Sequence, residues 1–398
     1  MSDIFNDPLL SYKNFKMGTE IDISGTFIYN GIKELEQMDS FRNESEVFSF
    51  LYHIAVGIER LQKVLIVMLE DIDQNNMHSF EESLITHSHQ ELQNRIKLKC
   101  SISFNSRENS FLQVLSEFYK KGRYDRFNIS GRYGVEIIII ENYIKNNLES
   151  TDYEIDVFSN HIVNSNKIKE LFGRVIGSIS KKYYNEIWNQ STTQKIYTYE
   201  LRHESKAAKI FLHEFEKNSL HKQTINEKIA LKEFIVFLIN TKQNNSFRRF
   251  LKEIEPLDFE IALTNEYLES LCKGIVPQEL IDTVEYLYEE HPYTAERIKM
   301  IDLIGNTRII FEFSEVYKCN DTLKSLLSGG YDCYDFALNF PNDIEDLEYD
   351  EAYEILKEIP EICRHYVSQL EIGIDEKDKF ITKIKEIYDK YIDFFNLD

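Results

Sequence analysis

Apolar residues recur every three or four positions over residues 48–72. This spacing places them on one face of an α-helix, because a helix turns once every 3.6 residues. Glu59 and Lys63 lie four residues apart within the segment, which is the spacing of an ion pair on a helix surface. The segment is therefore predicted to be an amphipathic helix. Its core-facing positions are Leu51, Ile54, Ile58, Leu61, Leu65, Met68 and Leu69.

The same periodicity continues along the chain and predicts a protein built from helices. No proline occurs between Pro8 and Pro256, so long uninterrupted helices are permitted there. Residues 137–140 are four consecutive isoleucines that fit either a buried strand or a buried helix, and we favour the helix. Helices are predicted over residues 110–121, 136–148, 167–187, 196–217, 226–241, 278–290 and 380–395. The predicted fold class is all-α, a multi-helix bundle.

Charge divides the chain into two regions. The whole chain carries a formal net charge of −22, from 46 Lys and Arg against 68 Asp and Glu. Residues 251–398 hold 14 of these cations and 35 of the anions, a net of −21, which leaves −1 for residues 1–250. We therefore predict a helical region over residues 1–250 and a second, acidic helical domain over residues 251–398.

Composition bounds the class of protein. The 398 residues are 42% hydrophobic, which is enough to form a large core despite the high charge. The N-terminal residues lack the cations and the apolar stretch of a secretory signal. Apolar runs such as residues 64–69 are far shorter than the roughly 20 residues that span a bilayer. The five widely spaced cysteines indicate reduced thiols. We expect a cytoplasmic globular protein that does not bind a membrane.

A basic island over residues 93–132 holds nine cations and three anions. Its centre, FYKKGRYDRFNISGRYG at residues 118–134, also carries aromatic rings. Cations neutralise phosphates and aromatic rings stack on unpaired bases, so the island predicts contact with RNA or another nucleic acid. Alternatively, the rings belong to the core, and the cations form a solvated face or dock the chain's own acidic region. The residues predicted to bind nucleic acid are Arg95, Lys120, Lys121, Arg123, Tyr124, Arg126 and Arg132.

A second group of basic residues occurs in YELRHESKAAKIFLHEFE, residues 199–216. On a helix, Arg202, Lys206, Lys209 and His213 would share one side. Such a stripe is typical of the solvated face of a surface helix. It also fits a catalytic site, because an Arg can hold a scissile phosphate and a His can move a proton. Arg202 and His203 are the predicted catalytic residues.

The sequence gives little support for other well-known metal-binding or catalytic motifs. His87 and His89 in ITHSHQEL would point about 200° apart on a helix, so they could share a metal ion only in an extended segment. The acidic run over residues 341–354 lacks the ligand spacing of an EF-hand and is predicted to be a helix start and a solvated loop. The sequence contains no GxxxxGK[ST], GxSxG or HExxH pattern. We expect neither a metal nor a cofactor.

The segment FSFLYHIAVGIERLQKVLIVMLE, followed by ITHSHQEL, resembles the helical HEPN superfamily (higher eukaryotes and prokaryotes nucleotide-binding domains). In that family a helix of the form A-x-x-x-E-x-x-x-K precedes a short loop and a helix that opens with His. Ala55, Glu59 and Lys63 match the first pattern, and His87 or His89 matches the second.

The resemblance implies an all-α bundle, often dimeric, that is found in prokaryotic toxin and antiviral defence systems and often acts as a metal-independent ribonuclease. The family's catalytic signature, R-x4-6-H, does not occur in this sequence. The nearest pairs are Arg202–His203 and Arg364–His365, in which the two residues are adjacent.

Three functions remain open at this point. The first is a HEPN-like defence or toxin–antitoxin protein that contacts RNA through the basic island, either as a metal-independent ribonuclease or as a non-catalytic RNA-binding relative. The second is a non-enzymatic interaction or scaffold protein, whose acidic C-terminal third binds a basic protein partner or covers the island. In the third, charge and aromatic content reflect only solubility and core filling. A protein partner is expected, including a second copy of the chain as a homodimer.

Overall fold

The computed structural model describes residues 7–73, 76–123, 127, 129, 134–212, 219–240, 246–306, 315–345 and 351–395. Within these ranges the chain is helical throughout its regular structure, and its only β-type pairings are the isolated bridges Ser40–Val163 and Ile155–Ile162. The predicted all-α fold is thus confirmed. No helix in the described part combines the length and apolar character needed to cross a bilayer.

The chain forms two compact units. The first comprises Met1–Glu233 and Leu268–Ile275, and the second comprises Phe234–Tyr267 and Val276–Asp398. The division falls within helix α10 (Leu220–Asn240), ahead of residue 250, and a short segment after it returns to the first unit. One contact of this returning segment is a hydrogen bond from Gln37 Nε2 to the Lys273 carbonyl, at 2.6 Å.

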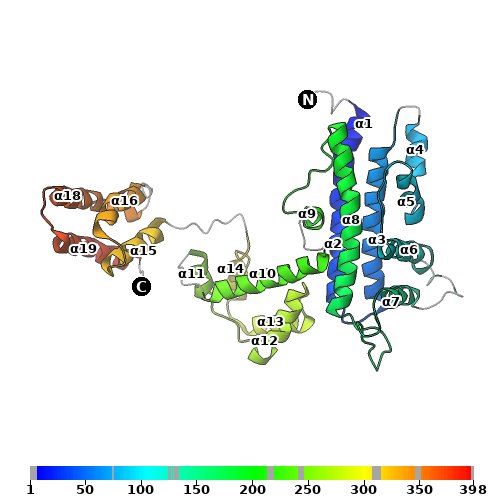
Figure 1. Ribbon diagram of the computed structural model, residues 1–398. Helices are drawn as coiled ribbons and strands as arrows, with labels where there is room; N and C mark the ends of the chain where they lie inside the picture. Colours follow the sequence, from blue (N-terminus) through cyan, green and yellow to red (C-terminus); the bar gives the residue numbers. More distant parts are fainter. Residues whose placement is uncertain are drawn as a thin grey trace. The chain divides into compact units, whose positions relative to one another are not determined.

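Three long helices form the frame of the first unit. They are α2 (Met17–Gln37), α3 (Glu44–Leu69) and α8 (Asn166–Gln194), which run alongside one another in Figure 1 and pack pairwise. Helix α3 covers residues 48–69 of the segment predicted from its apolar periodicity and ends three residues before residue 72. It begins after Asn43, whose side chain accepts a hydrogen bond from the Ser45 amide at 3.1 Å, as an N-cap residue does.

Shorter helices line the side of α3 that faces away from α2 (Figure 1). They are α4 (Met77–Ser83), α5 (His89–Lys97), α6 (Ser106–Glu117) and α7 (Val135–Asn147). Asn105 and Glu108 form a capping box at the start of α6, which fixes where that helix begins. Helix α7 contains the four isoleucines, so the helical interpretation of residues 137–140 is confirmed. The chain enters the unit through α1 (Pro8–Ser11) and the π-helical turn η1 (Tyr12–Lys16).

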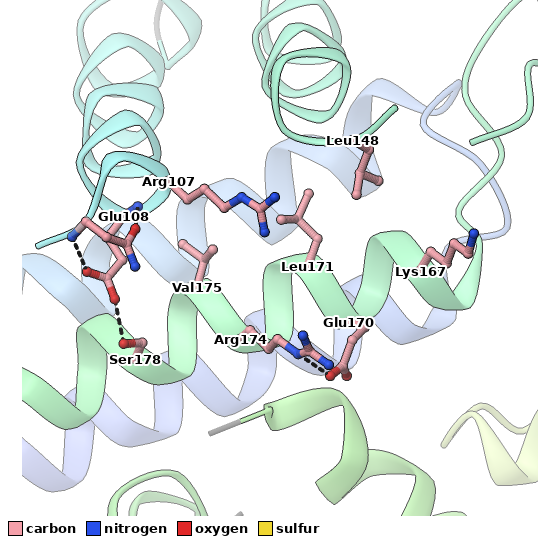
Figure 2. Close-up of a pocket in the computed structure, with 10 residues that line it drawn as sticks. Arg107, Glu108, Leu148, Lys167, Glu170, Leu171, Arg174, Val175 and Ser178 are labelled. Atoms are coloured by element: carbon pink, nitrogen blue, oxygen red, sulfur yellow. Dashed lines mark hydrogen bonds and ion pairs between the residues drawn. The ribbon is translucent and has the colours of Figure 1, made fainter. Parts of the chain in front are cut away.

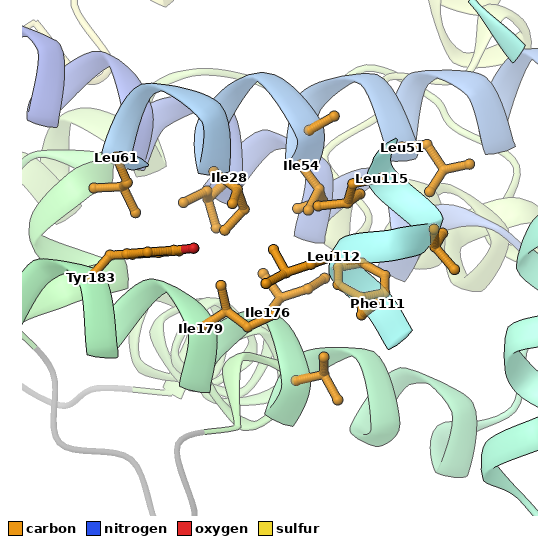
Figure 3. Close-up of a cluster of buried hydrophobic side chains, with 14 of the residues drawn as sticks. Ile28, Leu51, Ile54, Leu61, Phe111, Leu112, Leu115, Ile176, Ile179 and Tyr183 are labelled. Carbon is orange, nitrogen blue, oxygen red and sulfur yellow. The ribbon is translucent and has the colours of Figure 1, made fainter. Parts of the chain in front are cut away.

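The core of the first unit is continuous between α3, α6 and α8. Figure 3 shows side chains of these helices meeting, among them Ile54, Phe111 and Ile176, all fully buried. Each such side chain stabilises the fold by about 1.5–3 kcal/mol relative to an exposed position. Helices α2 and α3 approach closely at Gly57, where an added Cβ would lie 2.6 Å from Ile28 Cγ1. Only glycine fits this crossing.

The predicted helix over residues 196–217 is wrong in its first half. Helix α8 ends at Gln194, and its C-cap residue, Lys195, has a left-handed backbone with φ of 57°. The chain is then held against η1, because the Tyr197 amide donates to Asn14 Oδ1 at 2.9 Å. A new helix, α9 (Lys206–Phe211), begins only after Ser205, whose Oγ accepts from the Ala208 amide at 3.0 Å. Arg202 and His203 therefore precede the helix, and His213 lies outside the described residues.

The second unit has its own hydrophobic core. This core is formed by α15 (Glu315–Leu327), α16 (Cys333–Glu345), α17 (Glu351–Leu356), α18 (Ile359–Glu371) and α19 (Lys377–Phe395). Aromatic rings fill it: Phe336 stacks on Phe340 at 4.5 Å and Tyr366 on Phe380 at 4.3 Å between ring centroids. The unit also contains α11 (Ser246–Glu253), part of α12 (Thr264–Cys272), α13 (Gln278–Glu290) and α14 (Thr294–Ile301), with a 3₁₀ turn at Ile261–Leu263.

The acidic run over residues 341–354, predicted to be a helix start and a solvated loop, begins inside one helix and includes the start of another, α17 at Glu351. Pro341 lies inside α16, which begins at Cys333 because Asp332 Oδ1 accepts hydrogen bonds from the amides of Tyr334 and Asp335 at 2.8 and 3.1 Å.

Candidate functional site

Glu59, Lys63 and His87 meet in one cluster on the first unit. Glu59 on α3 is only 7% exposed, and its Oε1 accepts a hydrogen bond from Lys63 Nζ at 2.7 Å. The same carboxylate faces His87, with Nδ1 at 3.1 Å from Oε1 and 3.2 Å from Oε2. A buried carboxylate thus holds one cation and one imidazole.

The chain before α5 positions His87 over Glu59. The Thr86 amide donates to the Leu84 carbonyl at 2.8 Å, and the Ser88 amide donates to Thr86 Oγ1 at 3.3 Å. Ser88 caps α5 and has an extended backbone, so His87 projects from a short turn instead of from the helix. Its side chain is 54% exposed, which leaves the imidazole accessible from solvent.

The contact with Glu59 fixes the tautomer of His87. An ionised carboxylate only accepts hydrogen bonds, so Nδ1 must carry the proton that it shares with Glu59. In the neutral ring the lone pair then lies on Nε2. A carboxylate that orients a histidine in this way and stabilises its protonated form is the arrangement of a general base.

Tyr119 and Arg123 extend the cluster from the other side. The His87 ring stacks on Tyr119, with centroids 4.7 Å apart and planes at 22°. The Arg123 guanidinium lies 4.6 Å from the Tyr119 ring and 5.4 Å from the Tyr52 ring, and its Nη1 donates to Tyr119 Oη. Cation–π contacts of this kind hold a guanidinium beside aromatic faces. The site therefore combines an oriented imidazole with two cations, Lys63 and Arg123.

A π-helical turn positions Tyr119 and Arg123 in the cluster around His87. After α6 the backbone widens into η2 (Phe118–Gly122), and the Arg123 amide bonds the Phe118 carbonyl five residues back at 3.1 Å. Such turns are rare and often occur at functional sites. Gly122 is needed here, because a Cβ at this position would lie 2.9 Å from Cδ2 of the fully buried Phe118. The glycine in FYKKG is thus explained by the tight turn.

A buried hydrogen-bond chain anchors α5 beneath the site. Gln62 Nε2 donates to Tyr183 Oη at 2.9 Å and to the His89 carbonyl at 3.1 Å, so its Oε1 is left to accept from His89 Nδ1 at 2.9 Å. Burial lowers the pKa of His89 to about 4, since the charged ring would lose its hydration. His89 is therefore neutral and structural, while His87 faces solvent.

The residues predicted to bind nucleic acid lie in different surroundings. Arg95 is held by Glu70, with Nε–Oε1 at 2.5 Å and Nη2–Oε2 at 2.6 Å. Lys120 and Lys121 are exposed on η2, and Lys121 pairs with Glu117 at 2.9 Å. Arg123 belongs to the cluster around Tyr119. Tyr124, Arg126 and Arg132 lie outside the described residues.

The two predicted catalytic residues lie on the connection between α8 and α9. The Arg202 side chain is 84% exposed, and its Nη2 lies 3.3 Å from Asp22 Oδ2. His203 is exposed in the turn that follows. The structure gives neither residue a contact with the His87 cluster.

The two lysines of the predicted cationic stripe connect α9 to α2 and to α10. Lys206 Nζ donates to Asn30 Oδ1 at 2.8 Å, and Lys209 Nζ to Glu227 Oε1 at 2.9 Å. Burial opposes ionisation of Glu227, but hydrogen bonds from Lys33 and Lys209 outweigh it and lower its pKa to about 2. These lysines therefore serve the packing of the first unit.

A cavity of about 390 Å³ lies elsewhere in the first unit, between α6 and the start of α8 (Figure 2). Figure 2 shows Arg107 pointing into it from α6, while Arg174 is engaged by Glu170 at 2.5 Å. Glu108 is also engaged, by Ser178 Oγ at 2.5 Å and Lys182 Nζ at 2.6 Å. The charged groups are largely paired with one another, so this cavity offers no general base comparable to His87.

No protein-family model, curated protein sequence or solved structure matches this chain. The sequence resemblance pointed to Glu59, Lys63 and either His87 or His89, and the structure brings His87 to Glu59. The resemblance gave no indication of Tyr52 or Tyr119 as partners. Within the described residues no group of three His, Cys, Asp or Glu side chains is arranged to hold a metal ion.

Proposed function

We propose that this protein binds RNA and cleaves it without a metal ion, with His87 as the general base. The observation that carries this proposal is the contact between His87 Nδ1 and the buried Glu59 carboxylate, at 3.1 Å. That contact leaves Nε2 of an exposed imidazole to accept a proton. Lys63 pairs with the same Glu59 carboxylate, and Arg123 lies against the Tyr119 ring on which His87 stacks, so both cations belong to the same cluster.

In the proposed reaction the ribose 2′-OH attacks the adjacent phosphorus. His87 Nε2 takes the hydroxyl proton as the O2′–P bond forms, and Glu59 stabilises the resulting imidazolium. Arg123 and Lys63 stabilise the charge that develops on the phosphate oxygens. The P–O5′ bond then breaks, and the leaving 5′-oxygen takes a proton from water. The products are a 2′,3′-cyclic phosphate and a free 5′-hydroxyl.

The biological setting follows from the resemblance to the HEPN superfamily. Glu59 and Lys63 occupy the positions of the pattern A-x-x-x-E-x-x-x-K, and His87 lies in the turn just before α5, the helix that opens with His89. We therefore place the protein among prokaryotic antiviral defence or toxin–antitoxin proteins, acting in the cytoplasm and, like many members of that superfamily, as a homodimer.

The experiment is a cleavage assay on labelled single-stranded RNA in the presence of EDTA. The control substrate has the same sequence with 2′-deoxyribose at every position. We expect the RNA to be cut to products with cyclic phosphate ends and the deoxy strand to remain intact, because it lacks the attacking hydroxyl. Equal cleavage of both strands, or cleavage that EDTA abolishes, would contradict the mechanism.

The second candidate function is the binding of a basic protein partner by the acidic second unit. One observation favours it: four exposed carboxylates share one side of α13, within about 120° of each other at 100° per residue. These are Glu279, Asp282, Glu285 and Glu289. Replacing all four with Gln or Asn should abolish salt-dependent binding of a polylysine probe by the full chain. Unchanged binding would exclude this surface as the binding site for a basic partner.

A further inference from the structure

An aromatic groove lies between α8 and α9 in the first unit. Helix α9 packs against α8 (Figure 1), and the groove that they form with the connection between them has a volume of about 610 Å³. Four aromatic residues line it, namely Tyr184, Trp188, Tyr199 and Phe211. None of its lining residues belongs to the His87 cluster, so the groove is a separate candidate for a binding surface.

The four rings form a buried pair and a more exposed pair. Tyr184 and Phe211 are buried and stacked, with ring centroids 4.8 Å apart. Trp188 and Tyr199 meet edge to face at 6.0 Å, and Trp188 is 46% exposed. The Tyr184 hydroxyl donates to the Tyr199 carbonyl at 2.8 Å, which ties the connection to α8. Tryptophan is highly buried on average and is enriched at binding hot spots, so a half-exposed ring on a supported wall indicates a place for a ligand.

The polar groups of the groove favour a neutral ligand that presents hydrogen-bond acceptors. Trp188 Nε1, Tyr199 Oη and Asn185 Nδ2 can all donate, and none of them bonds another group in the described part of the chain. The two charged lining residues are Lys181 and Glu200, whose charges cancel. A nucleic-acid backbone would therefore meet no net positive charge here.

The length of the groove matches one turn of a polyproline II helix. Lys181, Asn185 and Trp188 recur at helical spacing on α8, so they share one face. From 181 to 188 this face spans about 10 Å at 1.5 Å per residue. A polyproline II helix rises about 3.1 Å per residue, so about three residues cover that length. Its backbone makes no internal hydrogen bonds and its prolines lack an N–H group, which leaves the carbonyl oxygens free to accept.

We infer that this groove binds a proline-rich segment of a partner protein in the polyproline II conformation. Proline rings pack against Trp188 and Tyr199, and the carbonyl oxygens between them accept from the three unused donors. Docking in a groove lined by aromatic rings is a recurrent way of recognising such segments. The six prolines of this chain are widely separated, so neither the chain itself nor a second copy supplies the segment. The inference goes beyond the proposed function and does not depend on it.

The test uses the fluorescence of Trp188, which is the only tryptophan in the chain. Full-length protein is titrated with decaproline, which forms a polyproline II helix, and with a Gly-Ser peptide of the same length, which is flexible. The variant Asn185→Ala/Tyr199→Phe removes two of the donors and keeps both exposed rings. The matched control, Asn189→Ala/Tyr197→Phe, makes the same changes at exposed positions outside the groove.

We expect decaproline to shift the Trp188 emission saturably in the wild type and in the control, with a Kd below about 1 mM. The Gly-Ser peptide should bind at least about tenfold more weakly, because it must be ordered on binding. The variant should lose about tenfold in affinity for decaproline, the effect of two lost hydrogen bonds. No saturable shift, equal affinity for the two peptides, or unchanged affinity in the variant would each overturn the inference. A larger shift with hexauridine than with decaproline would assign the groove to RNA bases and would also overturn it.

Discussion

Nδ1 of His87 lies 3.1 Å from Oε1 of Glu59, although 28 residues separate the two along the chain. The carboxylate belongs to the core helix α3, and the imidazole belongs to the turn that precedes α5. A rigid, buried anion therefore orients a solvent-facing base, which is how catalytic histidines are commonly prepared for proton transfer.

Replacing Glu59 with Gln should slow RNA cleavage strongly while leaving RNA binding nearly intact. The amide keeps the size of the side chain but no longer stabilises the protonated His87 ring. We expect kcat to fall between tenfold and a thousandfold with KM changed less than threefold, in steady-state assays. Glu117→Gln is the control, because Glu117 forms an ion pair of the same spacing with Lys121 on the surface. If Glu117→Gln lowers kcat as much, the Glu59 contact has no special role.

Replacing Gly122 with Ala should disturb the turn that presents Tyr119 and Arg123. The new Cβ would lie 2.9 Å from Phe118 Cδ2, and Phe118 is fully buried. We expect a loss of about 1–3 kcal/mol in the free energy of unfolding, measured in urea, together with weaker RNA binding. Gly18→Ala is the matched control, since its nearest neighbour would be the Thr198 carbonyl oxygen at an ordinary 3.6 Å. A Gly122 variant as stable as the Gly18 variant would contradict this account of the π-helical turn.

Acid should destabilise the protein partly through His89. Burial lowers its pKa to about 4, whereas an unfolded chain has an ordinary value of about 6.5. The unfolded state therefore takes up a proton first as the pH falls, so stability is lost below about pH 6.5 and the loss levels off below about pH 4. Between pH 7 and pH 4.5, the protonation of His89 accounts for a loss of roughly 2 to 3 kcal/mol in the free energy of unfolding.

The measurement compares urea unfolding at pH 7 and pH 4.5 for the wild type and His89→Asn. The Asn variant is less stable overall. Its free energy of unfolding should, however, change less between pH 7 and pH 4.5 than that of the wild type, by the amount that His89 contributes. His78→Asn, a substitution on the exposed face of α4, should leave that difference unchanged. An identical pH difference in His89→Asn and the wild type would show that His89 is not buried in its neutral form.

The helices of the first unit could largely be predicted from the sequence, because their apolar positions repeat with a helical period. Helix α3 carries this pattern over its whole length, and α7 was identified despite its four consecutive isoleucines. The segment before α9 could not be predicted in this way. Its helical periodicity is overridden by the cap at Ser205 and by the contact between Tyr197 and Asn14.

Only part of the candidate site could be predicted. The spacing of Glu59 and Lys63 on one helix face was visible in the sequence, and so was a histidine near the start of the next helix. Which of His87 and His89 faces solvent depends on the cap at Ser88 and on the buried Gln62, and neither effect follows from spacing. The stacking of Tyr119 on His87 requires the π-helical turn η2, which has no periodic pattern that sequence analysis detects.

The central claim is that His87 performs the chemistry, and it is tested most directly by cleavage of labelled single-stranded RNA in EDTA. The wild type is compared with His87→Ala and with His78→Ala, which removes an exposed histidine from α4. We expect His87→Ala to lose at least a hundredfold in kcat while it still binds the RNA, and His78→Ala to cleave as the wild type does. Cleavage by His87→Ala at the wild-type rate would contradict the assignment of His87 as the general base.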